Sequence, residues 1–184
     1  MWSALRNNEA RLYHVDGTLV HTFKGHTGWV NTVAVTPGGE HIISGADDHC
    51  VKVWSVATKS LVSTCYGHKE VAAVAAMPDG QRFLSAGLDS TVRVWLIDGT
   101  LKKTLRLHAD AVRTLVALPD NQHALSGSHD NTVKLFNVND GTVLRTFKHH
   151  TSYVTSLALL PDGLRFVSGS RDTTARIAHH GLAA

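Results

Sequence analysis

The sequence has little cysteine: Cys50 and Cys65 are the two cysteines among 184 residues. Two cysteines are too few for a disulfide framework, so we expect buried, reduced thiols, with a pair facing each other across one hairpin as the alternative. No apolar run reaches the length of a membrane span, and residues 1–6 have neither the basic leader nor the apolar stretch of a secretory signal. No Asn-X-Ser/Thr acceptor occurs. These absences favour an intracellular protein, cytoplasmic or nuclear.

The sequence also lacks concentrated charge and the spacings of metal and phosphate sites. The net charge is +3, and the basic residues are scattered singly, which gives no support to nucleic-acid binding. Thirteen histidines invite a metal site, but no Cys-X-X-Cys or His-Glu-X-X-His spacing occurs, and adjacent histidines at 149–150 and 179–180 point apart on a strand. No glycine-rich phosphate loop occurs either. We therefore expect no metal and no cofactor.

What the sequence does contain is one motif that recurs every 41 or 42 residues. Its copies occupy residues 44–54, 85–95, 126–136 and 168–178, and a degraded copy occupies residues 3–13. In the first of these, Val51-Lys52-Val53-Trp54 alternates apolar and charged residues, which is typical of a half-buried strand. A regular period over the whole chain indicates repeated structural units rather than one irregular core.

Each unit reads as four short strands joined by Gly, Pro and Asp turns. In the first complete unit the expected strands are 29–35, 41–44, 51–54 and 61–65, with a turn at Thr36-Pro37-Gly38-Gly39. No segment has a convincing helical period. One small antiparallel sheet cannot bury both faces, so the units must stack face to face. The predicted fold class is all-β.

Two further positions repeat in step with this motif. The first is a dipeptide that ends in histidine, at Gly25-His26, Gly67-His68, Leu107-His108 and His149-His150. The second is the last residue of each motif copy, which is mostly aromatic: Tyr13, Trp54, Trp95, Phe136 and Ala178. On these residues the chain resembles the WD-repeat (WD40) β-propeller family over essentially its whole length. The aspartate of the family's Trp-Asp pair is missing, since Ser55, Leu96 and Asn137 follow the aromatic residue.

The resemblance implies one propeller region of about four and a half repeats. We expect a partial blade at 1–25, complete blades at 26–67, 68–107 and 108–149, and a degraded or incomplete blade at 150–184. Because both end blades are incomplete in this division, it favours an open arc or a fragment of a larger propeller. The alternative is a small closed ring in which residues 10–23 supply the third and fourth strands to residues 150–170.

The resemblance also brings an Asp, a His and a Ser together in each blade. On composition alone this set suggests a hydrolase. However, it occurs four times, each in step with the aromatic position, so we interpret it as a structural network and predict no catalytic residue and no enzyme activity. The predicted network residues are His26, Ser44, Asp48 and Trp54, then His68, Ser85, Asp89 and Trp95, then His108, Ser126 and Asp130, and finally His150, Ser168 and Asp172.

In the family that the chain resembles, partners usually bind at a rim where two sets of loops emerge. These loops join the fourth strand to the next first strand and the second strand to the third. The residues here that match the family's contact positions are Trp29, Asn31, Glu70, Ala72, Ala111, Arg113, Tyr153 and Thr155, together with Arg6, Asp47, Leu88, His129 and Arg171 just before each turn. The alternative is an ordinary loop surface, with Trp29 packed on the adjacent blade.

The predicted function is a non-catalytic scaffold that presents these rim loops to partner proteins or peptides, within a multi-subunit complex and without nucleic acid or membrane. The alternative is a regulatory or substrate-recruiting segment of a larger enzyme, such as a kinase, an NTPase or a ubiquitin ligase, whose catalytic part lies outside this chain. An open arc would also expose an apolar face and an unpaired edge strand at each end, so we expect self-association through the end blades.

Overall fold

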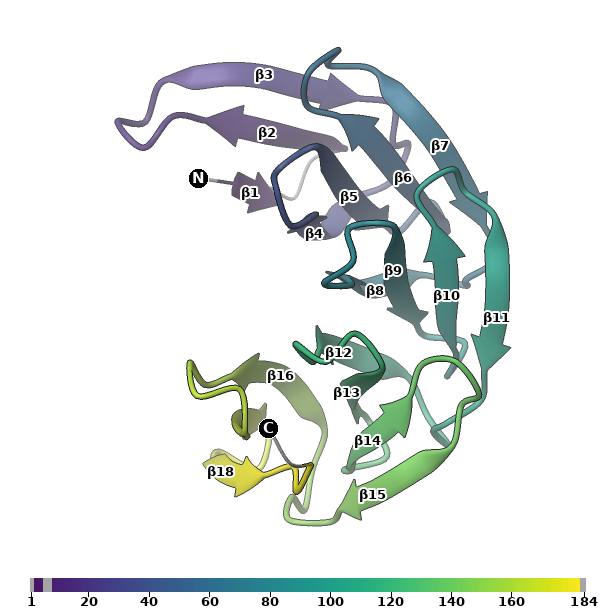
Figure 1. The fold of residues 1–184 in the computed structure, drawn as a ribbon, viewed down its shortest axis with the longest axis vertical. Helices are drawn as coiled ribbons and strands as arrows, with labels where there is room; N and C mark the ends of the chain where they lie inside the picture. The colour runs from purple at the N-terminus through teal and green to yellow at the C-terminus, as the bar shows by residue number, and fades with distance from the viewer. Residues whose placement is uncertain (1, 5–7, 183–184) are drawn as a thin grey trace.

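The structure is a computed structural model that describes residues 2–4 and 8–182. In this part of the chain it contains 18 β-strands and no helix. The strands form five antiparallel sheets, which follow one another around an open arc (Figure 1). The fold is therefore all-β, as the strand-like pattern predicted.

The three central sheets each contain four strands that pair in chain order. The first comprises β4 (Val30–Val35), β5 (His41–Ala46), β6 (Cys50–Ser55) and β7 (Leu61–Tyr66). The second comprises β8 (Val71–Ala76), β9 (Arg82–Gly87), β10 (Val92–Leu96) and β11 (Leu101–Leu105). The third comprises β12 (Val112–Ala117), β13 (His123–Ser128), β14 (Val133–Asn137) and β15 (Val143–Phe147).

The two end sheets each contain three strands. The first sheet comprises β1 (Trp2–Ala4), β2 (Glu9–Tyr13) and β3 (Leu19–Lys24), which match the second, third and fourth strands of a unit. The last sheet comprises β16 (Val154–Leu159), β17 (Arg165–Ser170) and β18 (Ala175–His179), which match the first, second and third strands. No strand of one end sheet pairs with the other among the described residues, so the chain forms an open arc and not the small closed ring.

The hydrophobic core lies between neighbouring sheets. Leu84, Val92 and Val94 of the second central sheet share one buried cluster with Leu115 and Phe136 of the third. Because each central sheet has a neighbouring sheet on both faces, successive residues of its second strand are buried. In β5, for example, every residue after His41 is buried. The last sheet has a neighbour on one face alone, and its strand β18 is largely exposed.

The two cysteines lie on the same hairpin but on opposite faces of it. Cys65 pairs with Val51 across the β6–β7 ladder, whereas Cys50 pairs with Tyr66. Adjacent residues of a strand point to opposite faces, so the side chains of Cys50 and Cys65 do not face each other. Both thiols are free and buried, and burial raises the pKa of Cys65 to about 11. The facing pair that the sequence left open is therefore not present.

Close contact between blades requires a small residue in the second strand. The position after the buried serine is Gly45, Ala86, Gly127 or Gly169, and a Cβ atom added to Gly127 would lie 2.7 Å both from Thr114 Cγ2 and from Val154 Cγ1 of the next sheet. The cross-strand partner varies with it, because Gly127 pairs with Thr114, whereas Ala86 pairs with Ala73. The pair is glycine with threonine in the first and third central sheets, alanine with alanine in the second, and glycine with serine in the last sheet, so two bulky residues never meet there.

Gly127→Ala is therefore expected to lower the free energy of unfolding by about 1–3 kcal/mol through overpacking. Thr114→Ala in the same chain should recover part of that loss, because the pair then matches Ala73–Ala86. Urea unfolding of the wild type, both single variants and the double variant would measure the coupling. If Gly127→Ala lowers the free energy of unfolding by the same amount in the wild type and in the Thr114→Ala variant, the measurement contradicts the volume argument.

Candidate functional site

Each blade that carries a tryptophan has a continuous chain of hydrogen bonds in its buried interior. Trp54 Nε1 donates to Ser44 Oγ at 2.8 Å, and His26 lies 2.8 Å from Ser44 Oγ through Nε2 and 2.8 Å from Asp48 Oδ2 through Nδ1. A carboxylate can only accept, so Nδ1–H donates to Asp48. Burial lowers the pKa of His26 and keeps the imidazole neutral, so Nε2 accepts from the serine hydroxyl, whose oxygen accepts from the indole. The next blade repeats this with Trp95, whose Nε1 donates to Ser85 Oγ at 2.8 Å.

The other two blades retain the histidine contacts without the indole donor. His108 lies 2.8 Å from Asp130 Oδ2 and 2.7 Å from Ser126 Oγ. His150 lies 2.8 Å from both Asp172 Oδ2 and Ser168 Oγ. Phe136 and Ala178, which occupy the tryptophan position, have no N–H to donate. In these blades the serine keeps its histidine partner alone among the side chains of the network.

A tight turn between the second and third strands places each aspartate. The residue after the aspartate has a positive φ in every case, at His49, Ser90, Asn131 and Thr173. This turn lets Asp48 accept hydrogen bonds from the backbone amides of Cys50 and Thr27. Burial disfavours the charged form of Asp48, but the bonds from Thr27 and His26 outweigh that effect and lower its pKa.

The chemistry available to this network is limited by burial. Ser44, Ser85 and Ser126 have no exposed surface, and the oxygens of Ser44 and Ser85 already accept an indole hydrogen bond. A nucleophile must reach its substrate, and these hydroxyls are enclosed between sheets. Their arrangement instead satisfies polar groups that the packing of the sheets removes from water.

Asp89→Ala is expected to lower the free energy of unfolding by about 1–3 kcal/mol, because it leaves the His68 N–H without its acceptor in a buried position. Thermal and urea unfolding would measure the change. Asp98→Ala on the same sheet is the matched control, since Asp98 is an exposed turn residue that accepts from the Thr100 amide. An unchanged melting temperature in Asp89→Ala would refute this role.

Acidification should destabilise the fold in two stages. Burial lowers the pKa values of His26 and His68 in the folded protein, whereas in the unfolded chain they keep their ordinary value near 6.5. At a pH between the lowered and the ordinary value, the unfolded chain therefore binds more protons than the folded protein. Stability is therefore expected to be full above pH 6.5 and to fall as the pH drops below it. The lowered pKa values of Asp48 and Asp89 add a second loss, which begins below about pH 4.

Melting temperatures measured at pH 7.5, 6.5 and 5.5 test the first stage. The His68→Gln variant should show a smaller drop than the wild type, because one of the histidines with a lowered pKa is removed. His14→Gln, which removes an exposed histidine outside the network, should keep the wild-type drop. A melting temperature that stays constant over this range would contradict the assignment.

The predicted rim residues lie at one edge of the arc, where backbone hydrogen bonds join the two sets of loops. In four successive sheets the amide of the residue before the turn aspartate donates to a carbonyl of the preceding loop. Asp47 donates to Trp29 at 3.0 Å and Leu88 to Glu70 at 3.1 Å. His129 donates to Ala111 and Arg171 to Tyr153, each at 2.9 Å. The structure therefore brings the two sets of predicted rim positions into contact within each blade.

Side chains extend these contacts from blade to blade. Arg113 Nε donates to His129 Nε2 at 3.1 Å, and Arg113 also forms an ion pair with Glu70 at 3.6 Å. The His129 ring stacks on Tyr153 of the next blade, with ring centroids 4.1 Å apart and 15° between the planes. The Arg171 guanidinium carbon lies 5.7 Å from the centre of the Tyr153 ring. We name these five residues the rim cluster.

The electrostatics of the rim cluster keep its histidine neutral. Burial, Arg113 and Arg171 together lower the pKa of His129, against the opposite influence of Asp110. Since Nε2 accepts from Arg113, the imidazole proton lies on Nδ1. The cluster thus presents two guanidinium groups and two stacked aromatic rings at the surface.

The remaining predicted rim residues fall into three groups. Asn31 Nδ2 donates to Asp47 Oδ1 and to the Val71 carbonyl of the next blade, and Thr155 Oγ1 donates to Gly169 O. Trp29 is exposed, whereas Leu88, Ala72 and especially Ala111 are more buried and contribute little surface. Arg6 lies outside the described residues.

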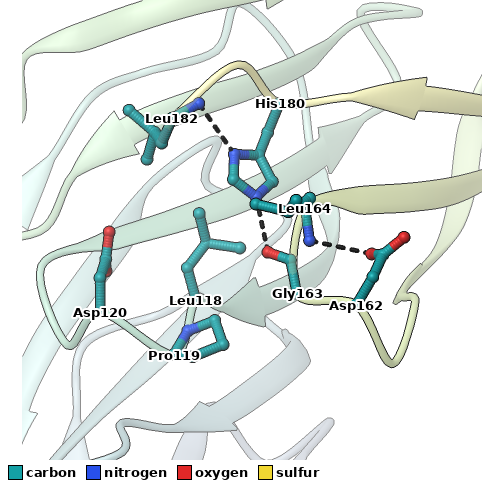
Figure 2. Close-up of a pocket in the computed structure, with 8 residues that line it drawn as sticks. All are labelled: Leu118, Pro119, Asp120, Asp162, Gly163, Leu164, His180 and Leu182. Atoms are coloured by element: carbon teal, nitrogen blue, oxygen red, sulfur yellow. Dashed lines mark hydrogen bonds between the residues drawn. The ribbon is translucent and has the colours of Figure 1, made fainter. Parts of the chain in front are cut away.

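Sequence reasoning missed a pocket at the other edge of the arc, shown in Figure 2. The pocket has a volume of about 320 Å³ and is lined by the β12–β13 and β16–β17 loops and by His180 and Leu182. His180 Nε2 donates to Gly163 O at 2.8 Å, and Nδ1 accepts from the Leu182 amide at 3.2 Å. The position of His180 in the repeat could have indicated it, because His180 corresponds to the apolar residues Val56, Ile97 and Val138 of the other units. Its polar groups are occupied within the chain, so it is a weaker candidate for binding than the rim.

Two absences among the described residues concern metals and membranes. No group of three or more His, Cys, Asp or Glu side chains is placed to hold a metal ion within residues 8–182. In the described part of the chain, no helix has the length and apolar character needed to cross a membrane.

Repeated four-stranded sheets, tied internally by the same His–Ser–Asp contacts and stacked around an arc, define a β-propeller built from WD repeats. Comparison with protein families agrees: the family described as "WD domain, G-beta repeat" matches residues 17–55, 59–95, 99–137 and 141–178. The chain belongs to this family.

Individual relatives match short segments of the chain. It is 48% identical over 42 residues to a "Ribosome biogenesis protein BOP1 homolog" of Drosophila grimshawi, which covers 23% of this chain and 5% of that protein. It is 41% identical over 49 residues to "Pre-mRNA-splicing factor prp46" of Emericella nidulans, which covers 27% and 11%. It is 37% identical over 59 residues to "Nuclear distribution protein PAC1" of Candida tropicalis, which covers 29% and 12%. The matches thus span between 5% and 12% of the length of these relatives.

Proposed function

We propose that this chain is a non-catalytic scaffold that binds a protein or peptide partner through the rim cluster and the neighbouring loops. The observation that supports this proposal is the set of four backbone hydrogen bonds that join the two loops of the rim in successive blades. Because these bonds involve no side chain, the residues that face solvent can differ from blade to blade on one fixed framework. A preformed surface loses little conformational entropy when it binds a partner.

The composition of the rim supports a protein partner. Tyr153 and Trp29 are exposed aromatic residues, and Arg113 and Arg171 lie beside the stacked His129–Tyr153 pair. Tyrosine, tryptophan and arginine are the residue types most enriched in the hot spots of protein interfaces. The full set proposed for the rim comprises Trp29, Asn31, Asp47, Glu70, Leu88, Arg113, His129, Tyr153, Thr155 and Arg171.

The proposal that the chain is not itself an enzyme rests on the repetition and burial of the Ser–His–Asp set. The set occurs once in each of four blades, and its serines are enclosed between sheets. A catalytic site needs one accessible nucleophile rather than four buried ones.

The names of the relatives support work within an assembly inside the cell. They refer to ribosome biogenesis, pre-mRNA splicing and nuclear distribution. We extend to this chain the general expectation of a protein partner in a cytoplasmic or nuclear complex, and no particular complex. The division into blades at 26–67, 68–107 and 108–149, with incomplete blades at 1–25 and 150–184, also remains our proposal.

Tyr153→Ala and Arg171→Ala are each expected to weaken partner binding at least about tenfold, because each removes a hot-spot side chain. The experiment compares proteins captured from a cell extract by the wild-type chain and by each variant, followed by affinity measurement on the purified partner. Lys102→Ala on the outer strand β11 is the matched control, since Lys102 is exposed and lies away from the rim.

Support for the proposal is a partner that the wild type and Lys102→Ala bind equally and that both rim variants bind more weakly. All variants should keep the wild-type melting temperature. A partner whose affinity is the same for all four chains would place the binding surface elsewhere.

A further inference from the structure

We propose that the two end sheets of the arc form a head-to-tail interface with a second copy of this chain, in which Ile177 and Arg165 of one copy meet Val15 and Asp16 of the next. This inference goes beyond the proposed rim and does not depend on it. Val15 and Asp16 lie in the β2–β3 turn at one end of the arc, and Arg165 begins β17 and Ile177 lies within β18 at the other end.

The contact between two interior sheets supplies the template. Arg82 and Val94 of the second central sheet line one small cavity together with Val138 and Asn139 of the third. Arg82 donates through one terminal nitrogen to Asn139 Oδ1 and through the other to the Asn121 carbonyl, each at 2.9 Å. Val94 and Val138 are 3% and 1% exposed. The interior contact thus combines a buried apolar pair with an arginine that crosses to the next sheet.

The last sheet carries the first half of this template without a neighbour. Arg165 precedes Ser168 by three residues, as Arg82 precedes Ser85, and Ile177 corresponds to Val94. Arg165 Nε donates to Asp162 at 2.6 Å, as Arg82 Nε donates to Asp79. The terminal nitrogens of Arg165 have no hydrogen-bond partner among residues 8–182, and Ile177 is 65% exposed.

The first sheet carries the second half. Val15 follows Tyr13 by two residues, as Val138 follows Phe136, so Val15 and Asp16 correspond to Val138 and Asn139. Val15 is 94% exposed, whereas Val138 is buried. Asp16 accepts a hydrogen bond from the Thr18 amide, which lowers the pKa of its carboxyl group and keeps it charged at neutral pH.

Charge complementarity selects a second copy as the occupant. At the interior contact the arginine meets a neutral amide, but at the ends the unpaired terminal nitrogens of Arg165 on one face match the negatively charged carboxylate of Asp16 on the other. Docking the last sheet of one copy on the first sheet of the next would therefore form an Arg165–Asp16 ion pair and bury Ile177 against Val15.

The geometry also limits the strength of this association. Strand β1 corresponds to a second strand, so the described residues of the first sheet offer no counterpart to the first-strand contacts of an interior pair. The interface between copies is consequently weaker than that between blades of one chain, and it depends on protein concentration. The interface is heterologous, since it joins the last sheet of one copy to the first sheet of another. Each assembly of copies therefore keeps one unpaired first sheet and one unpaired last sheet until a ring closes.

The test is sedimentation velocity of the full chain over a range from about 1 to about 100 µM, where interfaces of modest affinity assemble. The wild type should associate with rising concentration and dissociate in high salt. Arg165→Asp and Asp16→Arg should each weaken association at least about tenfold, because each places like charges opposite one another. An equimolar mixture of the two variants should associate as the wild type does, since every contact between unlike chains again joins opposite charges.

The mixture separates a lost interface from a damaged fold, since misfolded variants would not restore each other. The rim variant Tyr153→Ala should associate normally, so failure here and failure of the rim proposal give different results. A wild type that stays monomeric throughout the range, association that survives both substitutions, or a mixture that stays dissociated would each overturn the proposal.

Discussion

Burial of both faces of a small sheet is the constraint on which the rest of the structure depends. A four-stranded unit cannot remove Ile43, Leu84 or Leu125 from water alone, and each becomes fully buried because another sheet packs on it. The same packing encloses polar side chains of the second strand, such as Ser85, so these need partners within the blade. The hydrogen-bond network is therefore a consequence of sheet stacking, and its serines are buried for the same reason.

The network changes along the chain together with the packing around it. Trp54 and Trp95 complete it in the first two central sheets, Phe136 supplies a buried ring in the third without donating a bond, and Ala178 does neither in the last. The loss of the ring coincides with a sheet that has a neighbour on one face alone. The contacts of His150 with Ser168 and Asp172 are nevertheless retained there, because Ser168 and His150 remain buried against the preceding sheet.

Much of the fold was predictable from sequence because its determinants are local and repeated. The period places Ser44, Asp48 and Trp54 in adjacent strands and turns, so their order along the chain predicts which strand each occupies. The stacking of His129 on Tyr153 was not predictable, since it depends on the angle at which neighbouring sheets pack. The role of His180 was missed for a different reason: residues 150–184 were interpreted as a degraded or incomplete blade, and His180 was not compared with Val138 at the same position.

The rim and the end faces use one scaffold in two different ways. At the rim, backbone bonds such as Arg171 to Tyr153 set the loop geometry, so the surface side chains are free to carry specificity. At the ends, the side chains themselves match the interior contact, and Ile177 has the same position as a residue that is buried elsewhere. Under the two proposals, a change at the rim alters which partner is bound without altering the blade, whereas a change at an end face alters whether copies of the chain stack. The proposed binding specificity and the proposed assembly are separable, because they rest on different edges and faces of the same sheets.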